Sequence, residues 1–170
     1  MTPTASPTTK RPRLWPLAAV LLLFLALQLP PILRVSIVQY DESIFLDIGR
    51  NIHATGLPLR SLGPEGQLEL DQTPLYLYLL SGLMLLFGEN LFALRLVTLL
   101  AAAACVALVY LIDGRARGEA AGVVAGLLLA VNPFFNLYSF FLRMEAFACL
   151  FVLLAVYWLA EDEGRPARKQ

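Results

Sequence analysis

The sequence has few charged residues, two cysteines and a single histidine. Asp, Glu, Lys and Arg make up only 15% of the 170 residues, and their charges balance to a formal net charge of zero. Proteins that bind nucleic acids usually carry a basic patch, so no nucleic-acid partner is expected. Cys105 and Cys149 each lie inside an apolar run. This placement excludes a secreted disulfide framework and favours both residues as small apolar fillers.

The sequence also lacks the short motifs of several large enzyme classes. It contains no P-loop, CxxC pair, HExxH or GxSxG motif, and it shows no internal repeat. It is instead 58% hydrophobic, with a mean hydropathy of +0.68. Soluble domains are typically about 45–50% apolar and about 25% charged. The composition therefore predicts an integral membrane protein of the all-α class.

The N-terminal region combines a polar tail with a long apolar run. Residues 1–13 are rich in Pro and Thr and are predicted to form a disordered cytoplasmic tail. Lys10, Arg11 and Arg13 then precede the apolar run of residues 14–33. A signal peptide has the same order of features, but no A-x-A-like cleavage site follows and the run is long enough to span a bilayer. An uncleaved membrane anchor is the favoured interpretation.

Four further apolar runs follow, at residues 74–87, 91–112, 120–142 and 146–160. The first would cover only about 21 Å as a helix, against roughly 30 Å of hydrocarbon, so it either forms a short span or lies in the interface. The positive-inside rule favours the interfacial position, because it keeps the basic clusters on one side. The resulting prediction has about four transmembrane helices and cytoplasmic termini, including a tail at residues 161–170. An outer loop of about residues 35–90 contains two juxtamembrane helices.

The segment QYDESIFLDIGRNIHATG begins this outer loop and has the pattern of a short amphipathic helix. Asp41 is a good N-cap residue, and Gly56 is a good stop signal. Ile44, Ile48 and Ile52 recur at four-residue intervals and form one apolar stripe. The pattern predicts a helix that lies on the outer membrane surface.

Three acidic residues lie at the predicted outer membrane boundary. Asp41 and Glu42 follow the first apolar run, and Glu145 begins the last one beside Arg143. Carboxylates at this depth are costly unless they are hydrated, paired or bound to a cation, so the three could meet at a divalent cation or a substrate hydroxyl. The alternatives are that Asp41 only caps a helix, and that Glu145 pairs with Arg143 or caps the last span. His53 is interpreted as a solvated residue near a helix end.

Several segments in order resemble the N-terminal part of GT-C-type membrane glycosyltransferases. They are YDESIFLDIGRNIHATG, DQTPLYLYLLSGLMLLFGENLFALRLVTLL and VYLIDGRARGEAAGVVAGLLLAVNPFFNLYSFFLRMEAFACLFVLLAVY. The pattern is most similar to aminoarabinose transferases and to protein-mannosyltransferase-like enzymes of bacteria. It assigns residues 14–160 to a GT-C-like transmembrane region. The resemblance implies transfer of a sugar, with inversion, from a polyprenyl-phosphate donor to a lipid, glycan or protein acceptor. The reaction would take place on the outer face of the inner cell membrane.

The resemblance also implies roles for individual residues. Asp41 matches the acid of the first outer loop that acts as catalytic base or positions the acceptor. Glu42 matches its acidic neighbour and is also expected to be catalytic. Asp41 and Glu145 are the expected ligands of a divalent metal ion, such as Mg, Mn or Ca. Three further residues are expected to bind substrate: Arg143, Gln72 and Tyr76.

The sequence departs from the family pattern in two ways. Gln72 stands where relatives often have a lysine that can hold the donor phosphate, and Gln offers hydrogen bonds without charge. Family enzymes also have more spans and a further soluble domain, so we expect a partner chain to supply further spans.

Two alternatives to a transferase therefore stay open. One is a non-catalytic relative that binds lipid-linked sugar or serves in assembly, and the other is an unrelated four-span protein.

Overall fold

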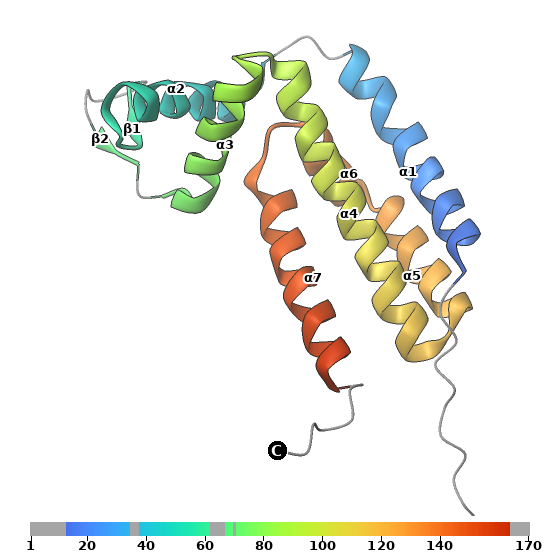
Figure 1. The fold of residues 1–170 in the computed structure, drawn as a ribbon. Coiled ribbons are helices and arrows are strands. Elements are labelled where there is room, and N and C mark those ends of the chain that lie inside the picture. The colour runs from blue at the N-terminus through green and yellow to red at the C-terminus, as the bar shows by residue number, and fades with distance from the viewer. Residues whose placement is uncertain (1–12, 35–37, 62–66, 70, 164–170) are drawn as a thin grey trace, which may run out of the picture.

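The computed structural model describes residues 13–34, 38–61, 67–69 and 71–163, and this part of the chain is mainly helical. Four helices form the main bundle, and α4 contacts each of the other three (Figure 1). They are α1 (Leu14–Arg34), α4 (Leu91–Arg117), α5 (Glu119–Ala130) and α7 (Met144–Glu163). Three more helices lie toward one end of the bundle: α2 (Tyr40–Thr55), α3 (Pro74–Phe87) and α6 (Pro133–Phe140). The predicted helical fold is confirmed for these residues, whereas the predicted N-terminal tail lies outside them except for Arg13.

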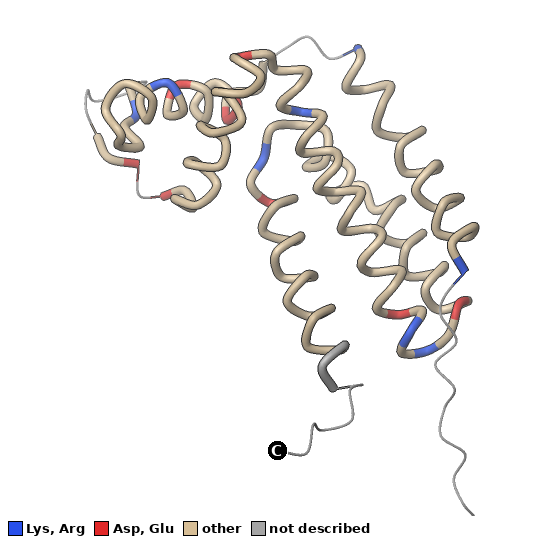
Figure 2. The backbone as a smooth tube through the Cα atoms, viewed as in Figure 1, with Lys and Arg blue, Asp and Glu red and all other residues tan. Residues whose placement is uncertain are grey.

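Charged residues lie toward the two ends of the bundle, and the middle of each long helix is free of them (Figure 2). The Tyr110 hydroxyl donates to the Arg13 carbonyl at 2.8 Å, so α1 begins beside the end of α4. The two helices are therefore antiparallel, and the chain leaves α1 and enters α4 at the same end. Both α2 and α3 lie at that end (Figure 1).

The number of possible membrane spans is lower than the sequence predicts. Among the described residues, α1 and α4 are long and apolar enough to cross a membrane. A third crossing is possible if α5 and α6, which are bent by 64° at their junction, act as one span. The apolar part of α7, Met144–Ala160, is shorter. The structure thus supports two or three spans by length and composition, where four were predicted.

The apolar run of residues 120–142 is not one straight helix, because α5 ends at Ala130 and α6 begins at Pro133. Pro133 cannot donate a backbone hydrogen bond, which favours it at the start of a new helix. The Asn132 side chain caps that helix by accepting from the Phe135 N–H at 3.0 Å. Asn136 then accepts from the Gln28 side-chain amide of α1 at 2.6 Å, which fixes α6 against α1.

Helix α2 differs from its prediction at its first residue and in what its apolar face contacts. It begins at Tyr40, and Gln39 rather than Asp41 occupies the N-cap position. Gly56 ends it as predicted, with φ of 78° and its N–H bonded to the Ile52 carbonyl at 2.8 Å. The isoleucine stripe is buried within the protein, in a cluster shared with α3, rather than spread on a membrane surface.

Between α2 and α3 the structure contains a small antiparallel hairpin that the sequence did not predict. Its strands are β1 (Leu59–Arg60) and β2 (Gln67–Leu68). Helix α3 has the same bounds as the predicted apolar run. His53 is exposed, as predicted, and its Nε2 lies 2.9 Å from the Ser81 carbonyl oxygen. Both cysteines, as predicted, are free rather than joined in a disulfide.

Gly122 allows α5 to pack directly on the backbone of α4. A Cβ atom at this position would lie 2.6 Å from the Tyr110 carbonyl oxygen and 3.0 Å from backbone atoms of Gly114. Backbone atoms cannot rotate away, so the two helices would have to separate. We expect Gly122→Ala to destabilise the protein by about 1–3 kcal/mol, seen as a lower thermal midpoint in detergent. Gly82→Ala is the control, since its Cβ meets nothing within 4 Å; equal midpoints for the two variants would contradict the prediction.

Candidate functional site

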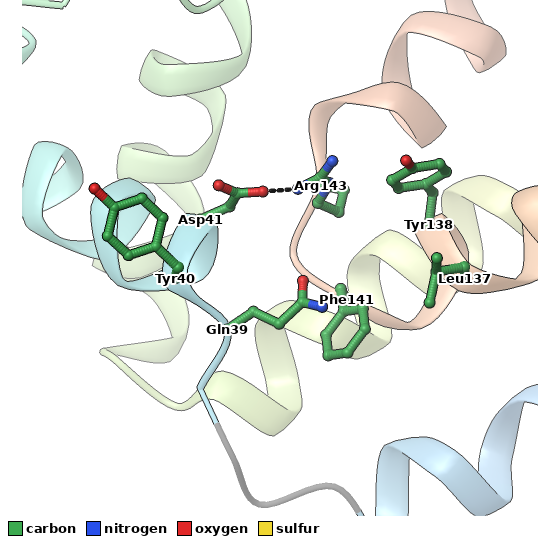
Figure 3. A pocket seen from close by; sticks show the side chains of 7 residues that line it. All are labelled: Gln39, Tyr40, Asp41, Leu137, Tyr138, Phe141 and Arg143. Carbon is green, nitrogen blue, oxygen red and sulfur yellow. Dashed lines mark hydrogen bonds and ion pairs between the residues drawn. The ribbon is translucent and has the colours of Figure 1, made fainter.

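A cavity of about 330 Å³ lies where the first turn of α2 faces α6 and the loop before α7. It is lined by Gln39, Tyr40, Asp41, Leu137, Tyr138, Phe141 and Arg143 (Figure 3). Asp41 and Arg143 point toward each other across it and form an ion pair. The Asp41 side chain is 45% exposed, so a ligand in the cavity can reach its carboxylate. The cavity therefore brings together an accessible carboxylate and a guanidinium from distant parts of the chain.

Arg143 contacts two of the three acids of the predicted site, Asp41 and Glu145. Its second terminal nitrogen donates to Glu145 Oε1 at 3.0 Å, and its guanidinium lies 4.8 Å from the centre of the Tyr138 ring. A cation over an aromatic face is stabilised by the ring quadrupole. Two carboxylates and one guanidinium give this group a formal charge of −1. The group is therefore well placed to attract a further cation or a proton donor.

Glu42, the neighbour of Asp41, points away from the cavity and is fully buried. Its carboxylate accepts two hydrogen bonds from Arg95 of α4, at 2.9 and 2.7 Å. It also accepts from the backbone N–H groups of Gln39 at 2.9 Å and Leu142 at 2.8 Å. This one carboxylate thus caps α2, neutralises a buried arginine and holds the loop before α7. The hydrogen bonds leave no unpaired charge behind.

The position of Glu42 explains how Asp41 meets Arg143. The Glu42 carboxylate accepts a hydrogen bond from the backbone N–H of Leu142. Asp41 precedes Glu42 and Arg143 follows Leu142, and these two neighbours form the ion pair in the cavity. The buried contact therefore sets the register of the exposed one. Arg95 also contacts the loop before α7, with its guanidinium 5.4 Å from the centre of the Phe141 ring.

The predicted site residues do not all line the same space. Asp41 and Arg143 line the cavity, and Glu145 is connected to it through Arg143. Glu42 lies behind it in the core. Gln72 precedes α3 and Tyr76 lies in its first turn, and neither lines the cavity.

Tyr76 is packed between two aromatic rings at the start of α3. Its ring centre lies 5.2 Å from that of Phe45 and 5.7 Å from that of Phe147. Burial raises the pKa of Tyr76 well above its usual value, and the negative charges of Glu145 and Glu42 raise this pKa further. The phenol therefore stays neutral and can donate a hydrogen bond.

Sequence reasoning did not assign Gln39, Tyr40 or Tyr138 to the site, and it did not predict that Arg95 pairs with Glu42. Arg95 had a usable signal, because an arginine inside an apolar helix is costly unless a partner neutralises it. The other three had none, since polar and aromatic residues near a membrane boundary are common in any role.

The described residues contain no group of three or more His, Cys, Asp and Glu side chains that could hold a metal ion. Asp41 and Glu145 nevertheless have two properties that suit a divalent cation. Their group with Arg143 is formally negative, and Glu145 Oε2 is buried without a hydrogen-bond partner. Mg²⁺ is commonly held by one or two carboxylates together with a substrate phosphate. These two residues would hold such an ion, and the expected metal stays a prediction.

Apolar helices that can cross a membrane and a charged cavity at one end of their bundle define a helical membrane protein with a polar site. The chain belongs to the dolichyl-phosphate-mannose-protein mannosyltransferase family, whose family model matches residues 71–163, more than half of the chain. The predicted membership in a family of membrane glycosyltransferases is thereby confirmed. The match includes Arg143 and Glu145, whereas Asp41 and Glu42 precede it. No curated protein and no solved structure matches the chain.

Proposed function

We propose that this protein transfers a sugar from a polyprenyl-phosphate donor to a hydroxyl or amine of a lipid, glycan or protein acceptor. The observation that carries the proposal is the Asp41–Arg143 pair, which places a base and a cation on facing walls of one cavity. Transfer to a nucleophile needs a group that takes a proton, and departure of a phosphate needs positive charge. The family match to mannosyltransferases supports the same chemistry.

In the proposed reaction Asp41 is the general base. Its carboxylate accepts the acceptor's proton while the acceptor oxygen or nitrogen attacks the anomeric carbon of the sugar. The new bond forms as the bond from that carbon to the phosphate oxygen breaks, and the electron pair leaves with the lipid phosphate. Attack from the face opposite the leaving group inverts the anomeric configuration.

Arg143 connects donor binding to the activation of Asp41. The donor phosphate competes with Asp41 for the guanidinium, because Arg binds phosphate and carboxylate with the same planar set of N–H groups. When Arg143 turns to the phosphate, the Asp41 carboxylate is free to accept a proton. The negative charge of the site opposes phosphate binding, and a divalent ion bound by Glu145 and one oxygen of Asp41 would neutralise that phosphate. The second oxygen of Asp41 would then accept the proton.

The distribution of basic residues supports an outward-facing site in the inner cell membrane. Arg13 lies 3.8 Å from Glu119, so it shares one end of the bundle with Arg115 and Arg117 of the α4–α5 turn. The cavity is lined by residues of α2 and α6, and α2 lies toward the other end (Figure 1). Basic clusters favour the cytoplasmic side, and the cluster at the α4–α5 turn supports cytoplasmic termini and an outward-facing cavity.

The proposal is tested with the native protein purified into lipid vesicles and supplied with polyprenyl phosphate bearing radiolabelled mannose. Label should move into extracted lipid, glycan or protein from the source membranes. Donor binding without any transfer would contradict the proposal and favour a non-catalytic sugar-binding subunit.

Replacing Arg143 with Lys tests its contact with the phosphate. Lys keeps the charge but loses the planar set of N–H groups, so we expect kcat/KM for the donor to fall about tenfold, the loss of one charge-assisted hydrogen bond. Arg50→Lys is the matched control, because Arg50 pairs with Glu89 on the surface and does not line the cavity. Equal kcat/KM values for the two variants would exclude this role for Arg143.

A further inference from the structure

The aromatic rings that line the Asp41 cavity differ in how much surface each offers to a ligand. Tyr40 is 71% exposed, whereas Phe141 is only 8% exposed. The Tyr138 ring is half-buried, and the Arg143 guanidinium lies over it at 4.8 Å. Tyr40 therefore offers the most accessible ring in this lining, and it is the neighbour of Asp41 in the sequence.

The Tyr40 ring is held in place although it is exposed. Arg60 Nη2 donates a hydrogen bond to the Tyr40 hydroxyl at 3.0 Å. Figure 3 shows this hydroxyl directed away from Arg143, so the bond holds the end of the ring that is remote from the ion pair. An exposed side chain normally samples several rotamers and loses entropy when a ligand fixes it. A ring that is already fixed avoids part of that loss on binding.

The β1–β2 hairpin supplies the arginine that holds Tyr40. Arg60 lies on β1, and its Nη1 is 3.9 Å from the carboxylate of Glu69, which follows β2 and is buried. The Asn51 side-chain amide of α2 donates to the Leu59 carbonyl at 2.7 Å, which attaches β1 to the helix that carries Tyr40. Tyrosines are common at membrane boundaries, but an anchor in the boundary needs no such bond. The hairpin therefore has a part in shaping the cavity.

The walls of the cavity match the chemistry of a sugar ring. A pyranose presents C–H bonds on its faces, and these pack against the negatively charged face of an aromatic ring. Its hydroxyls lie around the edge, where Asp41 and Gln39 of the same lining offer hydrogen-bond partners. The volume of about 330 Å³ lies at the lower end of the range for ligand pockets and fits a single ring. A serine hydroxyl would use Asp41 but leave Tyr40 in water.

We propose that the acceptor is a glycan whose terminal sugar stacks on Tyr40, and that Arg60 positions the Tyr40 ring through its hydrogen bond. This inference rests on the proposed function and narrows its acceptor to one class. A hydroxyl of the stacked sugar gives its proton to the Asp41 carboxylate while its oxygen attacks the anomeric carbon of the donor. The bond from that carbon to the phosphate oxygen breaks, and the electron pair leaves with the lipid phosphate.

The first test identifies the group that receives the sugar. The native protein in lipid vesicles is given polyprenyl phosphate bearing isotope-labelled mannose and an extract of the source membranes. Permethylation followed by mass spectrometry shows which group is joined to the label, and we expect a sugar hydroxyl. Label on serine, threonine or a lipid amine would overturn the inference and leave the proposed function standing. No transfer of label to any acceptor would overturn both.

The second test measures kcat and KM with the glycan acceptor purified from that extract. Tyr40→Leu keeps an apolar side chain but removes the ring, so we expect KM to rise about tenfold with kcat within about twofold of wild type. Tyr78→Leu is the matched control. Tyr78 is also exposed and its hydroxyl donates to the Gly56 carbonyl at 3.0 Å, but it does not line the cavity. Equal KM values for the two variants would overturn the inference.

A double-mutant cycle tests whether Arg60 acts through Tyr40. Arg60→Met and Tyr40→Phe each remove the same hydrogen bond, so each should raise KM about threefold. The double variant should raise KM no further than either change alone, because the bond is lost only once. If the two effects multiplied instead, Arg60 would act on the hairpin independently of Tyr40, and its positioning role would be overturned.

Discussion

Asp41→Asn is expected to lower the rate of sugar transfer by about 10²–10⁴-fold. Asn keeps the shape of the side chain and can still contact Arg143, but it cannot take a proton at neutral pH. The measurement is the initial rate with saturating donor and acceptor in vesicles that contain equal amounts of inserted protein. Donor affinity should fall little or rise, because the neutral amide competes less with the phosphate for Arg143 than the carboxylate does.

Asp47→Asn provides the matched control for that experiment. It is the same chemical change on the same helix, but Asp47 bonds to the Ser61 N–H at 2.7 Å and does not line the cavity. Its transfer rate should stay within about twofold of the wild-type rate, as for a substitution away from the reacting atoms. If Asp41→Asn kept a similar rate, Asp41 would not be the base.

Glu42→Ala is expected to destabilise the protein by about 3–5 kcal/mol, because it leaves Arg95 buried without its partner. The same change removes the acceptor for two backbone N–H groups, so α2 and the loop before α7 lose their connection. The free energy of unfolding can be measured by titration with denaturant in mixed micelles. Glu89→Ala removes the exposed partner of Arg50 and should cost less than about 1 kcal/mol.

A double variant distinguishes the effect of the Glu42–Arg95 charges from the effect of the volume that the two side chains fill. Glu42→Leu with Arg95→Met replaces the pair by apolar side chains of similar size, and we expect it to recover most of the stability lost in Glu42→Ala. Transfer should nevertheless stay low, because Leu142 no longer has the acceptor that aligns Arg143 with Asp41. Full activity in the stable double variant would show that the pair does not position the site.

The acidic pair at the start of α2 therefore combines two functions that need opposite environments. Glu42 is buried, carries four hydrogen bonds and fixes the backbone, whereas Asp41 faces the cavity and stays accessible. Successive residues in a helix point in directions about 100° apart, so one can enter the core while the next faces a ligand. Adjacent acids at a membrane boundary are then explained without two catalytic carboxylates, and the catalytic role predicted for Glu42 becomes a positioning role in our proposal.

Local patterns were sufficient to predict the elements that depend on a few neighbouring residues. The apolar run at residues 74–87 gave the bounds of α3, and Gly56 gave the end of α2. The start of α2 was misassigned because Asp41 and Glu42 are both acceptable near a helix N-terminus, and only the contact with Gln39 selects Glu42. Apolar residues continue through Pro133, so the apolar run by itself does not show the 64° bend between α5 and α6.

The sequence by itself determined that this is a helical membrane protein of a glycosyltransferase family, and it predicted acids at one membrane boundary. Composition, apolar run length and the order of short motifs carry that information, and none of it needs a contact between distant residues. The tertiary structure decided which acid faces the cavity, which arginine is buried and which polar atoms lack partners. Those properties depend on residues about 100 positions apart, such as Glu42 and Leu142, that meet only after the helices pack.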